Sequence, residues 1–479
     1  MDIGLGKNKI KIKDKGKSML NGMKYKSAKS LIMTAVLLIS LILPSILVNA
    51  ADTSPFPYDA KYPYGAFSSL ADNQSSADQL VKTEWESWKS AHITSNGAKG
   101  FKRVQRDAAT NYDTVSEGLG YGMLLAVYFG EQQLFNDLYG YVKCYFNSNG
   151  LMSWHIDANG NIVGNDGKGA ATDADEDIAV ALVFAHKKWG AGSSVNYESE
   201  AKSYISKIYN HMVEKGTYII KNGDTWGGTS CVNPSYFSPA WYRIYADFTG
   251  NSEWIKVADK CYEIIDKAKN QSTGLVPDWC TAAGGQASGQ GYNFLYDAIR
   301  YQWRAAIDYS WYGNAKAKTN CDQISNFFKN IGITNIKDGY TISGSQVNSN
   351  HTATFVACGA AAAMTGTDST YAKSAYNECV KVKDQGSYTY FGNSLRMMAL
   401  LYTTGNFPNL YNYTPDIPTF TKGDVNKDGS VDALDFAAIK KALLSQSFAE
   451  IDTKAADMND DGTIDAVDYA KLKIVLLSN

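Results

Sequence analysis

The chain has 479 residues and a formal net charge of −2, because 48 acidic residues nearly balance 46 Lys and Arg residues. This charge offers no basic field for nucleic acid, and the length allows one large core plus a small module. Aromatic residues make up 13% of the chain and include 32 Tyr and 10 Trp. Rings in this number suit the stacking of sugars, although most aromatic side chains in a large domain belong to its core.

The first 50 residues have the composition of an export signal. Nine Lys residues precede an apolar run of 18 residues at 31–48. The run ends just before Ala50, a small residue that suits a cleavage site, so we expect a secretory signal peptide at 1–50 and no membrane attachment after cleavage. The alternative is a retained membrane anchor, because a run of this length can span a bilayer. Pro44, inside the run, favours cleavage.

The pattern from about residue 51 to 407 is helical. Apolar residues recur at helical spacing in several stretches, which Gly-rich loops separate, and strand-like alternation is scarce. These stretches are 174–189, 198–215, 239–249, 254–269, 296–311, 315–329, 353–364 and 394–403. We therefore expect one all-α domain at 51–407, built as a barrel or bundle. Prolines at three positions in 408–422 predict a short extended linker after it.

A single Glu stands among small and apolar residues just before a predicted helix. Gly118, Gly120 and Gly122 follow Glu117 and leave space beside its carboxyl group. Desolvation in such surroundings raises the pKa of a carboxyl group, which can then hold a proton near neutrality for a leaving group. The alternative is a Glu that the helix dipole alone favours at a helix N-terminus.

The helix predicted at 174–189 begins with a cluster of acids. These are Asp173, Asp175, Glu176 and Asp177. Thr172 or Asp173 is a natural N-cap, and acidic residues favour this end of a helix. One cap is enough, however, and four carboxylates repel one another unless some of them face a ligand or a cation. We therefore expect Asp173 and Asp175 to form a site at the mouth of the helix.

A third segment pairs an acid with a base. Asp297 and Arg300 are three residues apart, which places them on one face of the helix predicted at 296–311. The simpler explanation is a surface ion pair, which contributes little to stability. The functional explanation is a carboxylate that the Arg keeps ionised, so that it can serve as a base.

These segments occur in the order of a known family. The string at 171–179, with Trp189 after it, resembles the signature of glycoside hydrolase family 8 closely. Further matches, in the same order, lie at 116–118, 233–237, 296–300 and 392–396. The resemblance covers nearly all of 55–407 and implies an (α/α)6 barrel with a substrate cleft across one end. It also implies hydrolysis of glycosidic bonds with inversion at the anomeric carbon, and no cofactor for catalysis.

The resemblance implies roles for the matching residues. Glu117 is expected to be the general acid, Asp297 the general base that activates water, and Asp173 the residue that holds the sugar ring beside the scissile bond. The expected substrate-binding residues are Tyr236 and Arg300, which would position the base and the water, and the aromatic residues Trp154, Trp226, Tyr388 and Tyr390. An inverting mechanism needs the carboxyl groups of the acid and the base roughly 6.5–9.5 Å apart.

The resemblance implies that family members acting on chitosan carry the general base at another position in the chain. An Asp at position 297 therefore favours the branch of the family that acts on cellulose or xylan. We expect an endo-β-1,4-glucanase that cuts internal bonds of cellulose and related β-glucans, with an endo-β-1,4-xylanase as the nearest alternative. A non-catalytic glycan-binding subunit is disfavoured, because binding alone does not need Glu117, Asp173 and Asp297 together. Metal-dependent catalysis is also disfavoured, because no His accompanies the acids at ligand spacing.

The C-terminal 56 residues contain one twelve-residue loop twice, and an apolar run at helical spacing follows each copy. Positions 1, 3, 5, 9 and 12 are Asp or Asn, position 6 is Gly, and position 7 can lend a carbonyl oxygen. Ca²⁺ prefers such oxygen ligands around a tight turn. The sequence therefore predicts two Ca²⁺ ions. Their ligands are Asp424, Asn426, Asp428, Ser430, Asp432 and Asp435 in the first loop, and Asp457, Asn459, Asp461, Thr463, Asp465 and Asp468 in the second.

A duplicated loop and helix with Asp at position 12 resembles a type I dockerin, here at 423–479. The resemblance implies docking into a cohesin domain of a scaffold protein, and hence a secreted, extracellular subunit of a cellulosome. It further implies that loop positions 10 and 11 select the cohesin; these are Ala433, Leu434, Ala466 and Val467. The alternatives are a calcium-stabilised cap without a partner and a calcium sensor. A sensor would expose a Met-rich groove, whereas Met458 is the only Met in this segment.

Overall fold

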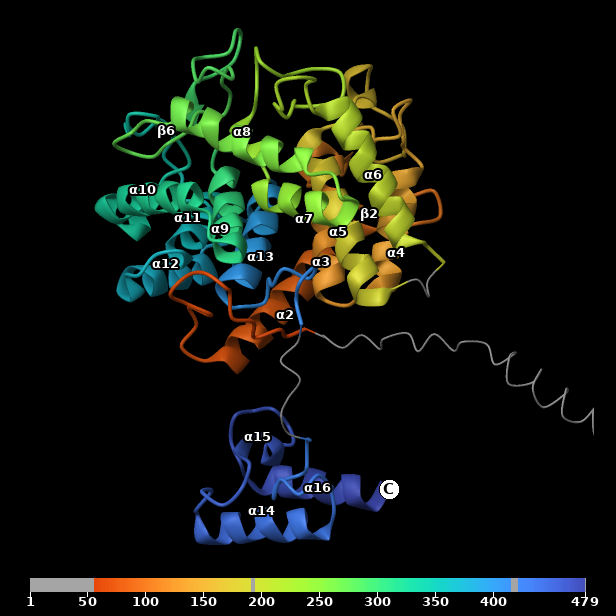
Figure 1. The fold of residues 1–479 in the computed structure, drawn as a ribbon, viewed down its shortest axis with the longest axis vertical. Coiled ribbons are helices and arrows are strands. Elements are labelled where there is room, and N and C mark those ends of the chain that lie inside the picture. The colour runs from red at the N-terminus through yellow and green to blue at the C-terminus, as the bar shows by residue number, and fades with distance from the viewer. Residues whose placement is uncertain (1–55, 191–193, 415–420, 479) are drawn as a thin grey trace, which may run out of the picture. The chain divides into compact units, whose positions relative to one another are not determined.

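The computed structural model describes residues 56–190, 194–414 and 421–478. Residues 56–190 and 194–414 form a large helical domain, and residues 421–478 form a small module (Figure 1). The predicted signal peptide at 1–50 lies outside the described residues. Within the described ranges, no helix is both apolar enough and long enough to cross a membrane.

The large domain is a double ring of helices, as expected for an (α/α)6 barrel (Figure 1). The inner ring consists of α3 (Ser116–Tyr128), α5 (Thr172–Trp189), α7 (Pro239–Thr249), α9 (Arg300–Tyr312), α11 (Ala353–Met364) and α13 (Tyr390–Thr403). The outer ring consists of α4 (Gln132–Lys143), α6 (Tyr197–Met212), α8 (Glu253–Ala268), α10 (Ala315–Ile331), α12 (Ser369–Lys381) and α2 (Gln74–His92). Each outer helix packs on the inner helix that precedes it in the chain, except α2, which packs on α13.

The composition of the helices explains their place in the rings. Every residue of the inner helix α11 is buried, and its many Ala residues let neighbouring helices approach closely. A helix that is apolar all round is stable only inside a core. The outer helix α8 buries one face instead, with Trp254, Val257, Cys261 and Ile265 at helical spacing, and turns its charged residues outward.

Some helix boundaries were predictable and others were not. Helices α7 and α11 have the predicted bounds, whereas α2, α4 and α12 were not predicted at all. Helix α9 begins at Arg300 rather than at residue 296, because the carboxylate of Asp278 accepts hydrogen bonds from the backbone N–H groups of Leu295 and Ala298 (3.0 and 2.8 Å). The prediction that Asp297 lies on a helical face is therefore wrong; it lies in the turn before the helix.

Strands in the described residues are short and connect the helices. They form three antiparallel pairs, β1 (Ile93–Thr94) with β2 (Arg103–Val104), β3 (Thr114–Val115) with β4 (His155–Ile156), and β5 (Asn293–Phe294) with β6 (Tyr340–Thr341). Single 3-10 turns lie at Ala108–Thr110, Asp166–Lys168, Pro234–Tyr236 and Ile333–Asn335. Strand β3 runs directly into α3 and so presents Glu117 in the first turn of that helix.

The start of the predicted linker belongs to the large domain. The hydroxyl of Tyr128 donates a hydrogen bond to the carbonyl oxygen of Pro408 (2.7 Å), and Leu410 is buried in the same core. The hydroxyl of Tyr413 donates to the carbonyl oxygen of Tyr58 (3.2 Å). Residues 408–414 are thus folded onto the barrel, because their apolar and aromatic side chains have a surface to cover. Residues 415–420 of the predicted linker lie outside the described residues.

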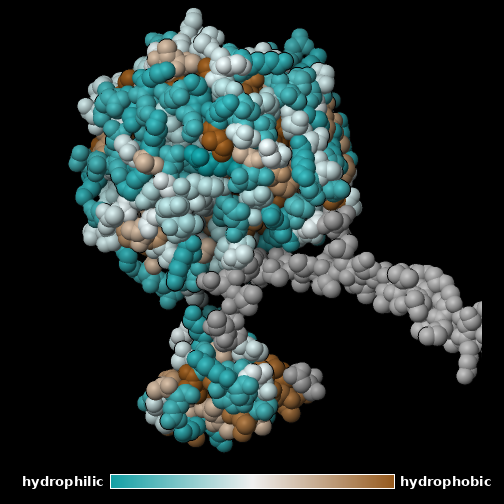
Figure 2. Space-filling model, in the orientation of Figure 1, coloured by the Kyte–Doolittle hydropathy of each residue, from teal (hydrophilic) through white to brown (hydrophobic). Residues whose placement is uncertain are grey.

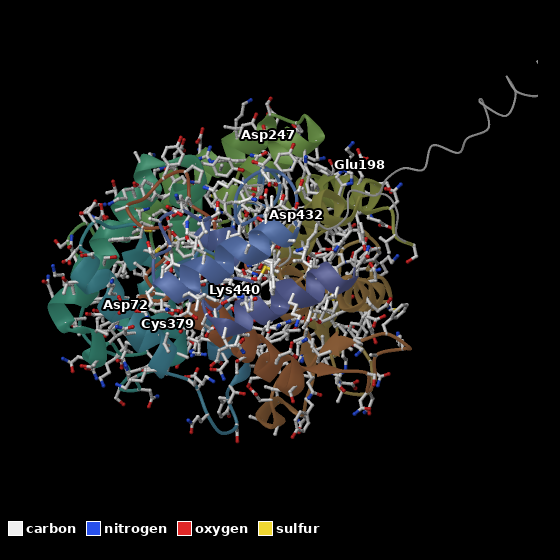
Figure 3. All side chains as sticks on the ribbon, turned by 90° about the horizontal axis from the view of Figure 1, so that it is seen from below. Asp72, Glu198, Asp247, Cys379, Asp432 and Lys440 are labelled. Atoms are coloured by element: carbon white, nitrogen blue, oxygen red, sulfur yellow. The ribbon has the colours of Figure 1, made fainter. Side chains whose placement is uncertain are left out.

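The small module contains α14 (Ala433–Ser445), α15 (Thr453–Ala456) and α16 (Ala466–Ser478). Its core centres on Ile439 and Leu472, which occupy matching positions after the two loops. The rings of Phe436 and Tyr469, another matching pair, stack with their centroids 4.1 Å apart. The repeat in the sequence therefore becomes a pair of equivalent helices packed on each other. Figure 3 labels Asp432, the residue that caps α14.

Candidate active site

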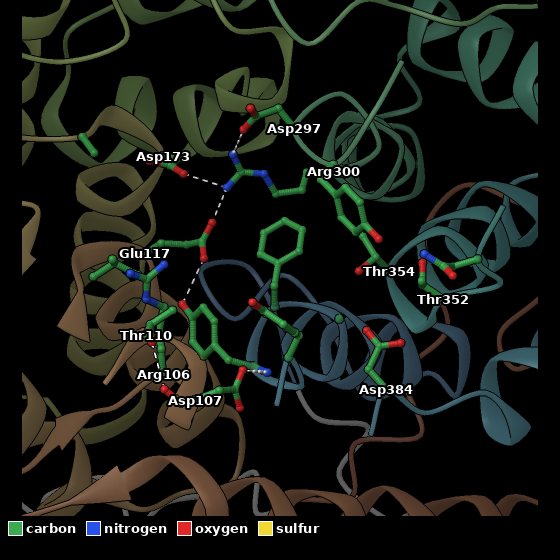
Figure 4. A pocket seen from close by; sticks show the side chains of 18 of the residues that line it. Arg106, Asp107, Thr110, Glu117, Asp173, Asp297, Arg300, Thr352, Thr354 and Asp384 are labelled. Carbon is green, nitrogen blue, oxygen red and sulfur yellow. Dashed lines mark hydrogen bonds and ion pairs between the residues drawn. The ribbon is translucent and has the colours of Figure 1, made fainter. Parts of the chain in front are cut away.

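One buried Arg gathers the predicted catalytic carboxyl groups (Figure 4). The Nη1 atom of Arg300 donates to Glu117 Oε2 (2.5 Å) and to Asp173 Oδ2 (2.7 Å). Its Nη2 atom donates to Asp297 Oδ1 (2.9 Å) and to Ser235 Oγ (2.9 Å). Arg300 is itself only 3% exposed, so its charge is compensated by these carboxyl groups rather than by water. The structure thus brings together three segments that lie far apart in the sequence.

Glu117 has the environment of an acid that keeps its proton. Burial raises the pKa of this carboxyl group to about 7, and the nearby carboxylates of Asp173 and Asp297 act in the same direction. Arg300 opposes this shift, as does the hydroxyl of Tyr390, which donates to Glu117 Oε1 (2.9 Å). A carboxyl group with a pKa near 7 can donate a proton at neutral pH.

Asp297 is the most open of the three carboxyl groups, with a third of its side chain exposed. It and Glu117 bond to different nitrogen atoms of one guanidinium group, whose fixed geometry keeps their nearest oxygens no more than about 8 Å apart. The neighbouring Asp278 accepts hydrogen bonds from two backbone N–H groups on either side of Asp297 in the sequence. Burial nevertheless raises the pKa of Asp278 to about 6. The segment that presents Asp297 is thus held from within the domain.

The acid cluster of α5 divides between the cleft and the core. Only Asp173 reaches the cleft; Asp177 forms a buried ion pair with Arg304 (2.8 and 2.9 Å). Asp175 accepts the hydroxyl of Tyr204, and burial raises its pKa to about 8. The expectation that Asp175 lines a site is therefore wrong. Neither Thr172 nor Asp173 caps the helix, since Ala171 is the N-cap residue and makes no side-chain bond.

The carboxyl groups open into a cleft of about 830 Å³. Trp154 lines this cleft, and its ring stacks on His155 with centroids 4.7 Å apart. Tyr236 also lines it, and its ring lies 5.3 Å from the guanidinium carbon of Arg300. Of the two candidates near the start of α13, Tyr388 lies in the preceding loop and is 76% exposed, whereas Tyr390 is the first residue of the helix, is 3% exposed and contacts Glu117. Tyr390 therefore does not present an open face.

Trp226 lies outside the set of residues that line the cleft. It is 45% exposed, and its ring leans against that of Trp279 with centroids 5.5 Å apart. Trp279 in turn meets Tyr236 edge-on at 6.3 Å. A row of three rings thus runs from Tyr236 to the surface.

Sequence reasoning missed several residues of the site. Ser235 shares Arg300 with the carboxyl groups, and Trp279 completes the row of rings. Tyr296 and Phe391 also line the cleft. Only Ser235 and Tyr296 stood inside a recognised motif; Trp279 had no local signal, because its role depends on a ring contributed by another segment.

The two predicted calcium loops have matching geometry. The carboxylate of Asp424 accepts the N–H groups of Asp428 and Gly429 (3.1 and 3.0 Å), and that of Asp435 accepts those of Asn426 and Asp432 (both 2.9 Å). The second loop repeats this pattern with Asp457 and Asp468, each 33 residues further on: their carboxylates accept N–H groups from residues 461 and 462, and from 458, 459 and 465, respectively.

The loops also have the donors and the turn that a hard cation needs. Gly429 and Gly462 have φ angles of 89° and 82° at the tight turn. Among the described residues, no three His, Cys, Asp or Glu side chains lie close enough together to hold a metal ion. The loop carboxylates instead bond to backbone N–H groups, and Asn and carbonyl oxygens supply part of the predicted set. The donor chemistry fits Ca²⁺.

Comparison with known proteins matches both parts of the chain to protein families. Residues 54–405 match the family described as glycosyl hydrolases family 8, and residues 422–477 match the dockerin type I domain. The chain therefore belongs to glycosyl hydrolase family 8 and ends in a type I dockerin.

Its relatives extend over almost the same length. The chain is 72% identical to Endoglucanase 2 of Ruminiclostridium josui over 434 residues, which cover 91% of this chain and 94% of that protein. It is 54% identical to Endoglucanase A of Acetivibrio thermocellus over 453 residues, again 91% and 94% of the two chains. The apo structure of a β-1,3-1,4-glucanase from Paenibacillus sp. X4 superposes with a TM-score of 0.69 at 30% identity, covering 74% of this chain and 99% of that one.

Proposed function

We propose that this protein is an inverting endo-β-1,4-glucanase that hydrolyses internal bonds of cellulose and related β-glucans. The observation that carries the proposal is the placement of Glu117 and Asp297 on different nitrogen atoms of Arg300, within one open cleft. The carboxyl group of Glu117 is mostly buried and has a raised pKa, and that of Asp297 is more open to water. An inverting glycosidase needs this difference between its acid and its base, together with room for water between them.

In the proposed reaction, Glu117 gives its proton to the glycosidic oxygen as the bond to the anomeric carbon breaks. Asp297 takes a proton from the water that attacks this carbon from the opposite face, so one water is added across the bond. Arg300 holds both groups in register and remains charged throughout. Asp173, beside the same guanidinium group, is placed to accept a hydrogen bond from a sugar hydroxyl.

The aromatic residues are proposed to hold the sugar chain on either side. Trp154 is fixed by its indole N–H, which donates to the carbonyl oxygen of Asp166 (2.9 Å), and by its stacking on His155. Trp226 offers a half-exposed ring further out. Fixed rings cost little conformational entropy when a ligand binds, which makes them suitable platforms.

The choice of glucan over xylan follows the relatives, since the two reported at 72% and 54% identity are named endoglucanases. An endo-β-1,4-xylanase on the same barrel is the second candidate. Glucan and xylan units differ by one hydroxymethyl group, so the room beside Asp173 decides between them.

The C-terminal module is proposed to bind one Ca²⁺ in each loop through the twelve predicted ligands and to dock into a cohesin domain. Figure 2 shows apolar side chains at the surface of the module. Leu434 and Val467 are 62% and 48% exposed, and Ala433 and Ala466 beside them are exposed as well. Exposed apolar residues at matching positions support a docking role. With the signal peptide predicted at 1–50, this module supports a secreted, cellulosome-associated enzyme.

The proposal is tested by reducing-sugar release from carboxymethyl-cellulose, mixed-linkage β-glucan, xylan and chitosan, using the purified protein of residues 51–479. Release from the two glucans alone is the expected result. Preference for xylan would support the second candidate and leave the chemistry intact. No release from any of the four would overturn the catalytic proposal and favour a glycan-binding subunit.

A further inference from the structure

The two oxygen atoms of Glu117 have different kinds of partner. Oε2 accepts from Arg300 Nη1 at 2.5 Å, and Oε1 accepts from the hydroxyl of Tyr390 at 2.9 Å. A guanidinium group can only donate hydrogen bonds, whereas a tyrosine hydroxyl can donate or accept. A proton on Oε2 would therefore face another N–H, but a proton on Oε1 would face an oxygen able to receive it.

We propose that Tyr390 is the positioning residue of the acid: its hydroxyl keeps the transferable proton of Glu117 on Oε1 until the glycosidic oxygen takes it. The inference rests on the proposed role of Glu117 as general acid. Before the reaction, the Oε1–H group donates to the Tyr390 hydroxyl oxygen. As the glycosidic C–O bond breaks, this proton moves to the leaving oxygen. The hydroxyl of Tyr390 then turns and donates to the new carboxylate, and solvent later returns a proton to Oε1.

Several contacts hold Tyr390 in place for this task. The backbone N–H of Tyr390 and that of Thr389 both donate to Asp107 Oδ2 (2.8 Å each), which ties down the start of α13. The ring of His92 meets that of Tyr390 edge-on, with centroids 5.7 Å apart. Because the ring is almost completely buried, Tyr390 acts through Glu117 rather than as a sugar platform.

The residue after Glu117 leaves room for this contact. A Cβ atom built on Gly118 would lie 2.9 Å from the Tyr390 hydroxyl oxygen and 3.0 Å from a methyl group of Val104. The first distance is shorter than real Cβ contacts and the second is tighter than most of them, so a larger residue would push the hydroxyl away from Oε1. The glycine thus permits the approach of α13 to the first turn of α3.

The experiment compares Tyr390→Phe with the wild-type protein on two substrates. Mixed-linkage β-glucan has a leaving group that needs a proton, and 2,4-dinitrophenyl β-cellotrioside has one that leaves without it. We expect kcat on β-glucan to fall about 10- to 100-fold, and the rate on the dinitrophenyl substrate to stay within about twofold. Equal loss on both substrates, or no loss on either, would overturn the proposal.

The pH profile gives a second readout that general damage to the fold would not move. Loss of a donor to the ionised carboxylate raises the pKa of Glu117, so the alkaline limb of kcat/KM should shift to higher pH in Tyr390→Phe. An unmoved limb, or one shifted to lower pH, contradicts the inference. The titratable and charged groups that face Glu117 are the same in both proteins, apart from Tyr390; they are Arg106, Tyr121, Asp173, Tyr236, Asp297 and Arg300.

Two further variants make the test decisive. Tyr371→Phe removes another buried hydroxyl, one that lacks a hydrogen-bond partner in the described part of the chain, and should match the wild type on both substrates. Gly118→Ala keeps the tyrosine but displaces it, and should reproduce the split between substrates even if Tyr390→Phe does not fold. If the wild type itself releases no sugar from any glycan, the proposed function fails instead, and the two failures are distinguished.

Discussion

Acidic side chains are concentrated in the first two turns of α5 and in the two loops of the C-terminal module, and the two regions use them differently. In α5 the partners come from distant segments: Asp173 bonds to Arg300, and Asp177 to Arg304, both 127 residues away. In the loops, the hydrogen bonds of Asp424 and Asp435 reach residues no more than nine positions away. The structure of the loops thus depends on contacts between residues that are close in the sequence. The acids of α5 find their partners only when the helices of the barrel come together.

The largest expected effect is the loss of catalysis when a distant partner is removed from the cleft. Glu117→Gln and Asp297→Asn should each lower the rate of sugar release by about 10²- to 10⁴-fold, because acid or base assistance is lost. Reducing-sugar assays on β-glucan measure this. The matched control is Asp72→Asn, which removes an exposed carboxylate paired with Lys373 (Figure 3) and should change nothing. Near-normal turnover of either cleft variant would contradict the catalytic role proposed for that residue.

The next effect concerns stability. Arg304→Met leaves the carboxylate of Asp177 buried without its ionic partner, which should lower the free energy of unfolding of the barrel by about 3–5 kcal/mol. Urea unfolding followed by tryptophan fluorescence reports on the barrel, because every Trp precedes the C-terminal module. Lys202→Met breaks an exposed pair with Glu198 and serves as the control, with an expected change of no more than about 1 kcal/mol. Equal losses of unfolding free energy in the two variants would mean that breaking the buried pair costs no more than breaking the exposed one.

The pH dependence is a smaller effect and follows from the pKa of Glu117. Burial raises this pKa to about 7, and the acid is active only when protonated. Activity should therefore be retained below this pH and fall about tenfold per unit once the pH rises above it. A profile of kcat/KM on β-glucan between about pH 5 and 9 checks whether activity falls as the pH rises above this pKa. Activity that rises through pH 7 to 9 would contradict the assignment of the acid.

Removal of calcium should affect the module alone. Chelation with EDTA is expected to abolish capture by an isolated cohesin domain, since the proposed Ca²⁺ ions would hold the loop carboxylates together. Sugar release from soluble β-glucan, measured in the same sample, should not change. Asp435→Ala should abolish capture even with calcium present, whereas Asp72→Asn should not. Capture that persists in EDTA would separate docking from calcium.

Features that depend on residues close in the sequence were predictable, whereas features that depend on contacts between distant segments were not. The two acidic loops and the paired helices after them could be predicted from spacing alone, since all the proposed ligands of one ion lie within twelve residues. The three cleft carboxyl groups were recognised through their motifs, but their common partner was not: Arg300 was paired only with Asp297, three residues away. Its bond to Glu117 crosses 183 residues and depends on how the rings close.

The errors have the same physical origin. The start of α9 could not be predicted, because the carboxylate of Asp278 holds the preceding turn from outside the helix. Asp175 was expected at the mouth of α5, but Tyr204 of the next helix holds it in the core. The start of the linker was misplaced for a related reason, since Leu410 finds a surface of the barrel to cover.

The sharing of one guanidinium group by three carboxyl groups also limits which polymers can approach. In the described lining of the cleft, carboxyl groups outnumber the cationic side chains, which are Arg106, Arg300 and Lys383. A polymer with carboxylate substituents near the scissile bond would be repelled there, and the low dielectric of the site strengthens the repulsion. Uncharged stretches of a chain should therefore be cut first, so the spacing of the substituents along carboxymethyl-cellulose would set the length of its fragments.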